Sequence, residues 1–496
     1  MTAVTEVRRS TRSGAIGLAG AAVNGAFGFV LTTVIVRTFG ADGSGALFSV
    51  IGLVTIVGAI CCLGADTGLM WALPRRRAGR DGDAARLLPL AVLPTLGLAL
   101  VVAMGGIAAA GPISRALLDE PAGTALVRLA FAGVPVIVAA TVLLAAVRAT
   151  RPVSAYVAVQ FLFVPIARPA LMIAGVVAGG GVLLGFGGWL LPMAVALLIA
   201  LALVAAPLGI GAGASLRPES ADWRWFWGFA LPRAASVAVD ASSMWVGVLL
   251  TGALATQAEA GVFAAVGRYA LAGLLIMQGL RVAVAPQLSR LLGDGQRHQA
   301  AQVYRRTTLG IVLLSWPAYL MLAVFAPAFL ALFGAEFRSG ATPMAVLAVA
   351  MLVNVGVGLV QTVLLMSGNS RGHLLATLAG LTLNVVACLV LVPRQGALGA
   401  AIAWSIGIVC ENVLAAVLAR RALGEALFGR TLVVSALAVT GATGVAAAIG
   451  TLVAGRGLPG LAVALGLVAA GCLAMLADRR VRAAIAAIRH QLKPAR

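Results

Sequence analysis

Apolar stretches long enough to cross a bilayer follow one another along almost the whole chain, separated by short polar connections. The hydrocarbon core of a membrane is about 30 Å thick, and a helix needs about 20 residues to span it. Hydrophobic residues fill 61% of the 496 positions and charged residues only 10%, too little polar sequence to cover a water-soluble protein. The sequence lacks the alternating segments of about 10 residues that build a membrane β-barrel. It therefore predicts an all-α polytopic membrane protein.

We expect about 14 transmembrane helices, counted from runs of the length that a crossing requires. Their predicted ranges are 16–37, 45–71, 87–110, 126–147, 153–177, 184–210, 228–252, 260–284, 308–333, 342–366, 372–392, 397–419, 430–453 and 457–477. An even number of crossings places both ends of the chain on the same side of the membrane.

Basic residues are concentrated in alternate connections between these helices. The net charge is +20, and arginines gather before the first helix, at 75–86, at 217–233, at 281–306 and after residue 420. Short loops rich in Lys and Arg face the cytoplasm. We therefore expect a multi-pass protein of the bacterial plasma membrane with both termini in the cytoplasm. No basic stretch is interleaved with stacking aromatic residues on a soluble module, which argues against nucleic acid as a partner.

An internal repeat divides the predicted helices into two sets. The segment VRTFGADGSGALFSV is echoed by LTGALATQAEAGVFAAV, so that Gly45 aligns with Gly261 at an offset of 216 residues. Six predicted helices separate the copies, and an even interval gives parallel repeats related by an axis along the membrane normal. The sequence predicts two six-helix lobes and a terminal helix pair. We expect a basic cytoplasmic tail at 1–15, lobes at 16–211 and 228–421, helices 13 and 14 at 430–477, and a basic amphipathic cytoplasmic tail at 478–496.

The sequence shows no constellation of residues for catalysis or for metal binding. Its five cysteines lie inside predicted helices without metal-like spacing, and its three histidines fall in predicted cytoplasmic segments. A membrane-embedded polymerase or ligase is expected to carry catalytic residues on a long external loop, and no connection here is long. We therefore expect no enzymatic activity, no cofactor and no metal ion.

Several segments, taken in order, resemble a known group of membrane proteins. They are VRTFGADGSGALF, WFWGFALPRAASVAVDASSMWVGVLL, APQLSRLL, FAPAFLALFGAEF and LVPRQGALGAAIAWSIG, spread over residues 15–421. Their order and spacing resemble bacterial polysaccharide exporters of the multidrug/oligosaccharidyl-lipid/polysaccharide exporter superfamily. The resemblance implies a flippase that carries an undecaprenyl-pyrophosphate-linked oligosaccharide to the outer leaflet for cell-surface polysaccharide biosynthesis. Multidrug or cation antiporters and lipid II flippases share this scaffold and stay open as alternatives.

Three charged residues inside predicted helices are the main candidates for a functional site: Arg168, Asp240 and Arg268. A charge at the middle of a bilayer costs about 2.5–3.5 kcal/mol even on a lenient scale, so each should face a cavity or a partner. We expect Arg168 and Arg268 to hold a pyrophosphate through charge-assisted, bidentate hydrogen bonds. Asp240 is either a coupling group that responds to protons or cations, or a structural ion-pair partner, for which Arg268 is a candidate.

Amide side chains in the predicted helices are weaker candidates, because they serve sugar hydroxyls and interhelical hydrogen bonds equally well. As possible sugar contacts we note Asn24, Gln278, Asn354, Gln361 and Asn384. We do not include Asp66, which lies near the end of a predicted helix, or Glu411, which has no evident opposite charge.

The expected partners follow from the implied substrate: a lipid-linked oligosaccharide, membrane lipids, and possible glycosyltransferases and a polysaccharide polymerase. An antiporter for cationic drugs would favour acidic and aromatic groups in its cavity. Two intramembrane arginines, one leading aspartate and few intramembrane aromatic residues instead favour an anionic substrate.

Overall fold

The computed structural model describes residues 3–78, 83–118, 123–208, 210 and 217–477. In this part of the chain every regular element is a helix, and ten helical stretches are long and apolar enough to cross a membrane. Two of these stretches, 19–61 and 370–423, contain 43 and 54 residues. Because one crossing needs only about 20 residues, each of the two accommodates two crossings. The predicted all-α polytopic fold is confirmed.

The first helix group precedes residue 210. It comprises α1 (Ala3–Cys61), α2 (Ala65–Ala78), η1 (Asp83–Arg86), α3 (Leu87–Ala108), α4 (Ala110–Leu117), α5 (Gly123–Thr150), α6 (Val153–Tyr156), η2 (Val157–Phe163), α7 (Val164–Val177), α8 (Gly181–Ala205) and η3 (Ala206–Leu208). Within it α3 and α8 pack on α5, and α7 packs on α8.

The second helix group and the terminal pair follow residue 217. The group comprises α9 (Ser220–Leu254), α10 (Gln257–Ala272), α11 (Leu274–Gly293), α12 (Arg297–Val324), α13 (Ala326–Leu330), η4 (Ala335–Gly340), α14 (Ala341–Gly356), α15 (Val360–Met366) and α16 (Ser370–Leu423). The terminal pair is α17 (Arg430–Ala454) and α18 (Leu458–Ala477), which pack on each other while α17 packs on α12.

Two glycines make the sharp turns inside the longest helices. Gly40 has φ +66° within α1, and Gly396 has φ +52° within α16. This left-handed region is one that glycine enters without steric cost. A carboxylate caps each turn: Glu336 accepts the Ala41 amide at 2.9 Å, and Glu259 accepts the Ala397 amide at 2.7 Å. Each turn therefore separates two of the crossings predicted from the sequence.

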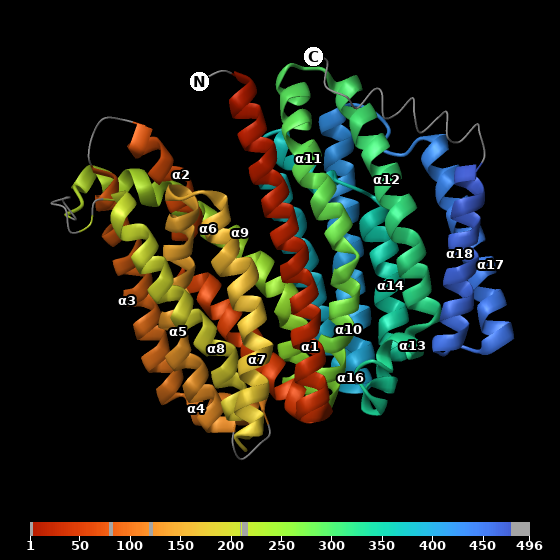
Figure 1. Cartoon of the computed structure of the whole chain (residues 1–496), viewed down its shortest axis with the longest axis horizontal. Coiled ribbons are helices and arrows are strands. Elements are labelled where there is room, and N and C mark those ends of the chain that lie inside the picture. The colour runs from red at the N-terminus through yellow and green to blue at the C-terminus, as the bar shows by residue number, and fades with distance from the viewer. Residues whose placement is uncertain (1–2, 79–82, 119–122, 209, 211–216, 478–496) are drawn as a thin grey trace.

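The predicted crossings correspond to helices along the whole described chain. Some consist of two helices, because breaks at Gly64, Gly273 and Gly358 interrupt α1–α2, α10–α11 and α14–α15. The beginning of α1 and the end of α18 lie at the same end of the bundle (Figure 1), as an even number of crossings requires. Predicted tail residues 1–15 are helical from Ala3 onward; the predicted tail at 478–496 lies outside the described residues.

One end of the bundle carries the arginine-rich connections between helices, and we call it the basic end. It includes the end of α2, the α11–α12 connection and the α16–α17 connection, all at the top of Figure 1. The turn within α1 and the connection between α17 and α18 lie at the opposite end (Figure 1). The two helix groups meet mainly along α1, α9 and α10, whereas α1 and α11 hardly touch.

Candidate functional site

Arg168 lies on α7, inside a crossing helix of the first group. Its Nε donates a hydrogen bond to the Trp189 backbone oxygen at 3.2 Å, and its guanidinium carbon lies 4.2 Å from the centre of the Trp189 ring. Phe186 stacks on Trp189, with ring centres 5.4 Å apart. Pro165 and Pro169 flank this turn of α7 and are buried. An arginine over an indole face keeps its remaining N–H donors available on its free edge.

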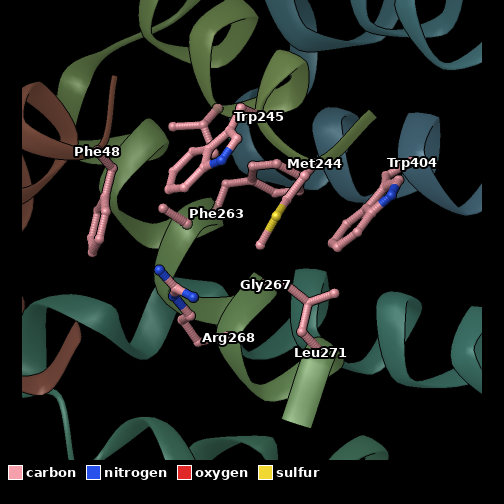
Figure 2. A pocket seen from close by; sticks show the side chains of 10 residues that line it. Phe48, Met244, Trp245, Phe263, Gly267, Arg268, Leu271 and Trp404 are labelled. Carbon is pink, nitrogen blue, oxygen red and sulfur yellow. The ribbon is translucent and has the colours of Figure 1, made fainter. Parts of the chain in front are cut away.

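Arg268 lies on α10, in the second group, at the edge of a small cavity lined by aromatic residues (Figure 2). The cavity is small, with a volume of about 30 Å³. Phe48, Trp245 and Trp404 are among the residues that line it. The guanidinium carbon lies 6.0 Å from the Trp245 ring centre. A Cβ atom on Gly28 of α1 would lie 4.0 Å from Arg268 Nη1, so the arginine reaches the first helix group.

The fold brings the two intramembrane arginines into electrostatic contact from different helix groups. The charge of Arg268 acts on Arg168, and both side chains are half-buried. Neither forms an ion pair with a carboxylate in the described part of the chain. Two cations that repel each other inside membrane-crossing helices are our candidate for a site that binds an anion.

Asp240 is an exposed residue of α9. The charges that act on it are those of His373 on α16, Arg233 on α9 and Arg281 on α11. It forms no ion pair with Arg268 within the residues that the structure describes. Asp240 thus belongs to a second charged cluster, built from α9, α11 and α16.

Glu411, which the sequence interpretation set aside, belongs to the same cluster. Gln361 Nε2 on α15 donates to Glu411 Oε1 at 2.6 Å, and Thr377 Oγ1 donates to it at 3.1 Å. The charge of Asp240 also acts on Glu411. The available signal was a carboxylate in the middle of an apolar helix, with amide and hydroxyl partners in the two preceding predicted helices. That signal needs no opposite charge, since hydrogen bonds hold the carboxylate in place.

The five amides proposed as sugar contacts fall into two kinds. Asn24 on α1 and Gln278 on α11 are exposed. Asn354 accepts a hydrogen bond from Asn412 Nδ2 at 3.0 Å, which links α14 to α16, and Gln361 is bound to Glu411 as above. Asn384 is buried and accepts a weak hydrogen bond from the Cys388 thiol at 3.5 Å. Sugar contact by all five stays a prediction, and Asn24 and Gln278 are the most accessible.

The two helix groups make close backbone contact near the opposite end, at the glycines that the internal repeat aligned. A Cβ atom on Gly45 would lie 1.8 Å from the Gln257 backbone oxygen, and one on Gly261 would lie 2.3 Å from the Ala41 oxygen. The 216-residue offset that aligns Gly45 with Gly261 also aligns Ala41 with Gln257. The contact is therefore reciprocal, as expected when a pseudo-twofold axis relates parallel repeats.

Further bonds cross the same interface. Arg37 Nε on α1 donates to the Leu332 backbone oxygen at 2.8 Å, and Glu336 on η4 caps the second half of α1 at Ala41. Near the basic end, ion pairs join Arg76 to Asp222 and Arg86 to Glu219, which attaches α2 and η1 to the start of α9. The groups are thus held together at the opposite end and, at the basic end, along the α2–α9 side.

Comparisons with known proteins agree with this architecture. No family model matches the chain. A curated relative, the probable low-salt glycan biosynthesis flippase Agl15 of Haloferax volcanii, is 25% identical over 178 residues, 34% of this chain. The match spans only 36% of the relative's own length.

Solved structures match over much more of the chain. The lipid II flippase MurJ in an inward closed conformation gives a TM-score of 0.72 at 10% identity, covering 92% of this chain and 99% of MurJ. An inward-facing multidrug resistance MATE family transporter gives 0.63 at 15% identity, with coverages of 80% and 94%. A Pyrococcus furiosus transporter of the MOP superfamily, described by the reversed polarity of its binding pocket, gives 0.60 at 18% identity, with coverages of 84% and 96%.

The fold is a polytopic all-helical membrane fold built from two helix groups around a shared interface. The resemblance predicted from the sequence is confirmed at this level. The chain shares its fold with the MATE family transporter and with the lipid II flippase MurJ.

Proposed function

We propose that the protein is a flippase that moves a lipid-linked oligosaccharide, carried on undecaprenyl pyrophosphate, across the bacterial plasma membrane. The pair formed by Arg168 and Arg268 supports this proposal most strongly. Each arginine at mid-membrane costs about 2.5–3.5 kcal/mol on the lenient insertion scale. The two cations also repel each other and have no carboxylate partner within the described residues. A pyrophosphate between them supplies the missing anion and matches the fork geometry of both guanidinium groups.

The basic end faces the cytoplasm in this proposal, following the distribution of Lys and Arg. The backbone contacts of Gly45 and Gly261, together with the Arg37 and Glu336 bonds, then close the outer side of the protein. The substrate enters from the inner leaflet between α1 and α11, which hardly touch, and its prenyl tail stays in lipid. Separation of the outer contacts releases the headgroup to the outer leaflet, by alternating access.

The second charged cluster is the proposed coupling element. Asp240 is exposed on α9 and lies in the electrostatic field of His373, Arg233 and Arg281. Its charge acts on Glu411, which hydrogen bonds hold in place. Two carboxylates that act on each other change their charge when a proton or cation binds, and the new charge can favour a different arrangement of the helices. The membrane potential, negative inside, also favours outward movement of an anion.

The similarity to named flippases supports the substrate class. Agl15 is named a probable glycan biosynthesis flippase and MurJ a lipid II flippase. In this proposal glycosyltransferases supply the substrate on the inner side, and a polymerase takes over the product outside. Exposed Asn24 and Gln278, on the helices that flank the entry, contact sugar hydroxyls.

Transport assays with reconstituted protein test the role of the arginine pair. We expect Arg168→Ala and Arg268→Ala to abolish flipping of a fluorescent undecaprenyl-pyrophosphate oligosaccharide in proteoliposomes, and Arg268→Lys to retain part of it. Arg394→Ala removes the same charge from an exposed position and serves as the matched control. Normal flipping by both pair variants, in protein that unfolds at the normal temperature, overturns the proposal.

A multidrug or cation antiporter is the second candidate, and two observations favour it. Aromatic side chains of Phe48, Trp245 and Trp404 gather beside Arg268, more densely than their number in the sequence suggested. Asp240 and Glu411 together also suit a cationic substrate. The same proteoliposomes decide between the candidates: uptake of a cationic dye that stops in Asp240→Asn, without flipping of the lipid-linked sugar, establishes the antiporter.

A further inference from the structure

A basic pocket lies at the basic end between α12 and α17, outside the interface used for transport. It encloses about 310 Å³. Its lining comes from two elements, with Gln302, Arg305, Arg306 and Leu309 on α12, and Gly429, Thr431 and Leu432 at the start of α17. Two adjacent arginines, an amide and a hydroxyl thus converge over two leucines. The pocket combines charged donors with an apolar floor.

The charges around the pocket leave an excess of positive charge. Glu425 pairs with Arg305 and is hydrogen bonded to His298. The hydrogen bond from His298 is the largest factor that lowers the pKa of Glu425, and Arg305 lowers it further, so Glu425 stays ionised. That one carboxylate offsets Arg305, whereas Arg306 is exposed and has no ion-pair partner in the part of the chain that the structure describes.

Arg305 itself is incompletely satisfied. Its Nη2 is bound to Glu425, but its Nε is buried and has no hydrogen-bond partner in the structure. A buried donor of this kind is costly, and it indicates a site that an acceptor oxygen completes. Thr431, in the first turn of α17, adds an exposed hydroxyl on the other wall. Phosphate oxygens suit this set of donors, since several N–H and O–H groups can bind one phosphate at once.

The surroundings show which phosphate compound fits. The pocket lies where crossing helices emerge from the membrane, and apolar side chains continue from it toward the middle of the bundle on both helices. Leu313 and Leu314 on α12 are 44% and 61% exposed, and Val434 and Leu437 on α17 are 55% and 68% exposed. These side chains face lipid, so a ligand seated in the pocket has room for acyl chains beside its headgroup. Anionic lipids bind such basic pockets at the inner side of membranes.

We propose that this pocket binds the phosphate headgroup of an anionic phospholipid of the inner leaflet, whose acyl chains lie along α12 and α17. The bound lipid joins the terminal pair to the second helix group at the basic end, where α17 begins. The site is separate from the arginine pair, and its occupancy does not depend on the transported substrate.

Lipid binding by the purified full-length protein tests the proposal. The probes are dioctanoyl phosphatidylglycerol, dioctanoyl phosphatidylcholine, glycerol 3-phosphate and inorganic phosphate. Affinity is read from the thermal unfolding midpoint in neutral detergent and stoichiometry from native mass spectrometry. We expect phosphatidylglycerol to bind more tightly than the other three probes. Arg306→Gln should weaken it by roughly tenfold, the usual effect of one charge-assisted hydrogen bond.

Arg290→Gln is the matched control, because Arg290 is exposed on α11 near the same end and the charge change is identical. Thr431→Val provides a second variant that leaves both arginines and the Glu425 pair in place. Weaker phosphatidylglycerol binding in Arg306→Gln and Thr431→Val, with normal binding in Arg290→Gln, supports the site. Equal binding of phosphatidylcholine, or equal losses in Arg306→Gln and Arg290→Gln, overturns it. Glycerol 3-phosphate binding as tightly as the lipid overturns the assignment to a phospholipid.

Discussion

Replacing Gly45 or Gly261 by alanine should open the end of the bundle opposite the basic end. The Cβ atom that Gly45→Ala adds would meet the Gln257 backbone oxygen at 1.8 Å, whereas ordinary van der Waals contact begins at 3.4 Å. The obstacle is backbone, so no side-chain rotation relieves the clash and the two helix groups must move apart. Gly261→Ala meets the Ala41 backbone oxygen at 2.3 Å and should have the smaller effect.

The expected magnitude follows from the cost of overpacking, typically about 1–3 kcal/mol. That cost falls on the closed arrangement alone, so the ratio of closed to open molecules drops by roughly 5- to 150-fold. Alanine is a better helix former than glycine by about 1 kcal/mol, so each helix itself is not weakened. A shift in conformation with no loss of thermal stability is therefore the signature that distinguishes this effect from misfolding.

Double electron–electron resonance measures the shift. Spin labels at positions 42 and 338, both exposed near the interface at the opposite end, are attached in a background without the native cysteines. We expect a longer-distance population in Gly45→Ala, a smaller one in Gly261→Ala, and none in Gly187→Ala, whose added Cβ meets nothing within 4 Å. Identical distance distributions in all three variants refute the reasoning.

Three other predictions concern single contacts. Glu336→Ala removes the carboxylate that caps Ala41 across the interface, which should cost about 1 kcal/mol, as is typical of a lost helix cap. The distances between the same spin labels should then increase, and unchanged distances would contradict this prediction. Glu411→Leu leaves the Gln361 amide without its acceptor and should lower stability by about 1–3 kcal/mol. Glu411→Gln should lose less, and thermal unfolding compares the two. Gly396→Ala forces a residue with a side chain into φ +52° and should destabilise the protein by about 1–3 kcal/mol. Equal unfolding temperatures for this variant and the unchanged protein would contradict the prediction.

The crossing helices could be predicted closely from the sequence, because membrane thickness fixes their length and lipid excludes charge from their sides. The turn at Gly40 was placed correctly between crossings for the same reason. The breaks within crossings, such as the one at Gly358, were not predicted. A glycine in an apolar helix is common, and only its packing shows whether the helix continues through it.

The neighbours of the charged residues could not be predicted from the sequence. That Arg168 and Arg268 must avoid lipid followed from solvation, but their approach across the interface depends on how the helix groups pack. Asp240 is also an ionisable group in a crossing helix, but the charges that act on it are those of His373, Arg233 and Arg281. Glu411 was set aside for want of an opposite charge, although hydrogen bonds from neighbouring helices sufficed to hold it.

In the mechanism proposed above, the placement of the two charged clusters makes substrate binding and the closed state depend on each other. Arg168 belongs to the first helix group and Arg268 to the second, so their repulsion acts to separate the groups. The proposed anion between them would turn that repulsion into a bridge, and it would dissociate more readily once the groups part and one arginine moves away. Asp240 and Glu411 lie within the second group, so a change in their charge acts on that group's own helices. In this proposal, binding and coupling therefore act on different contacts of one fold, so that each can be altered by mutation without removing the other.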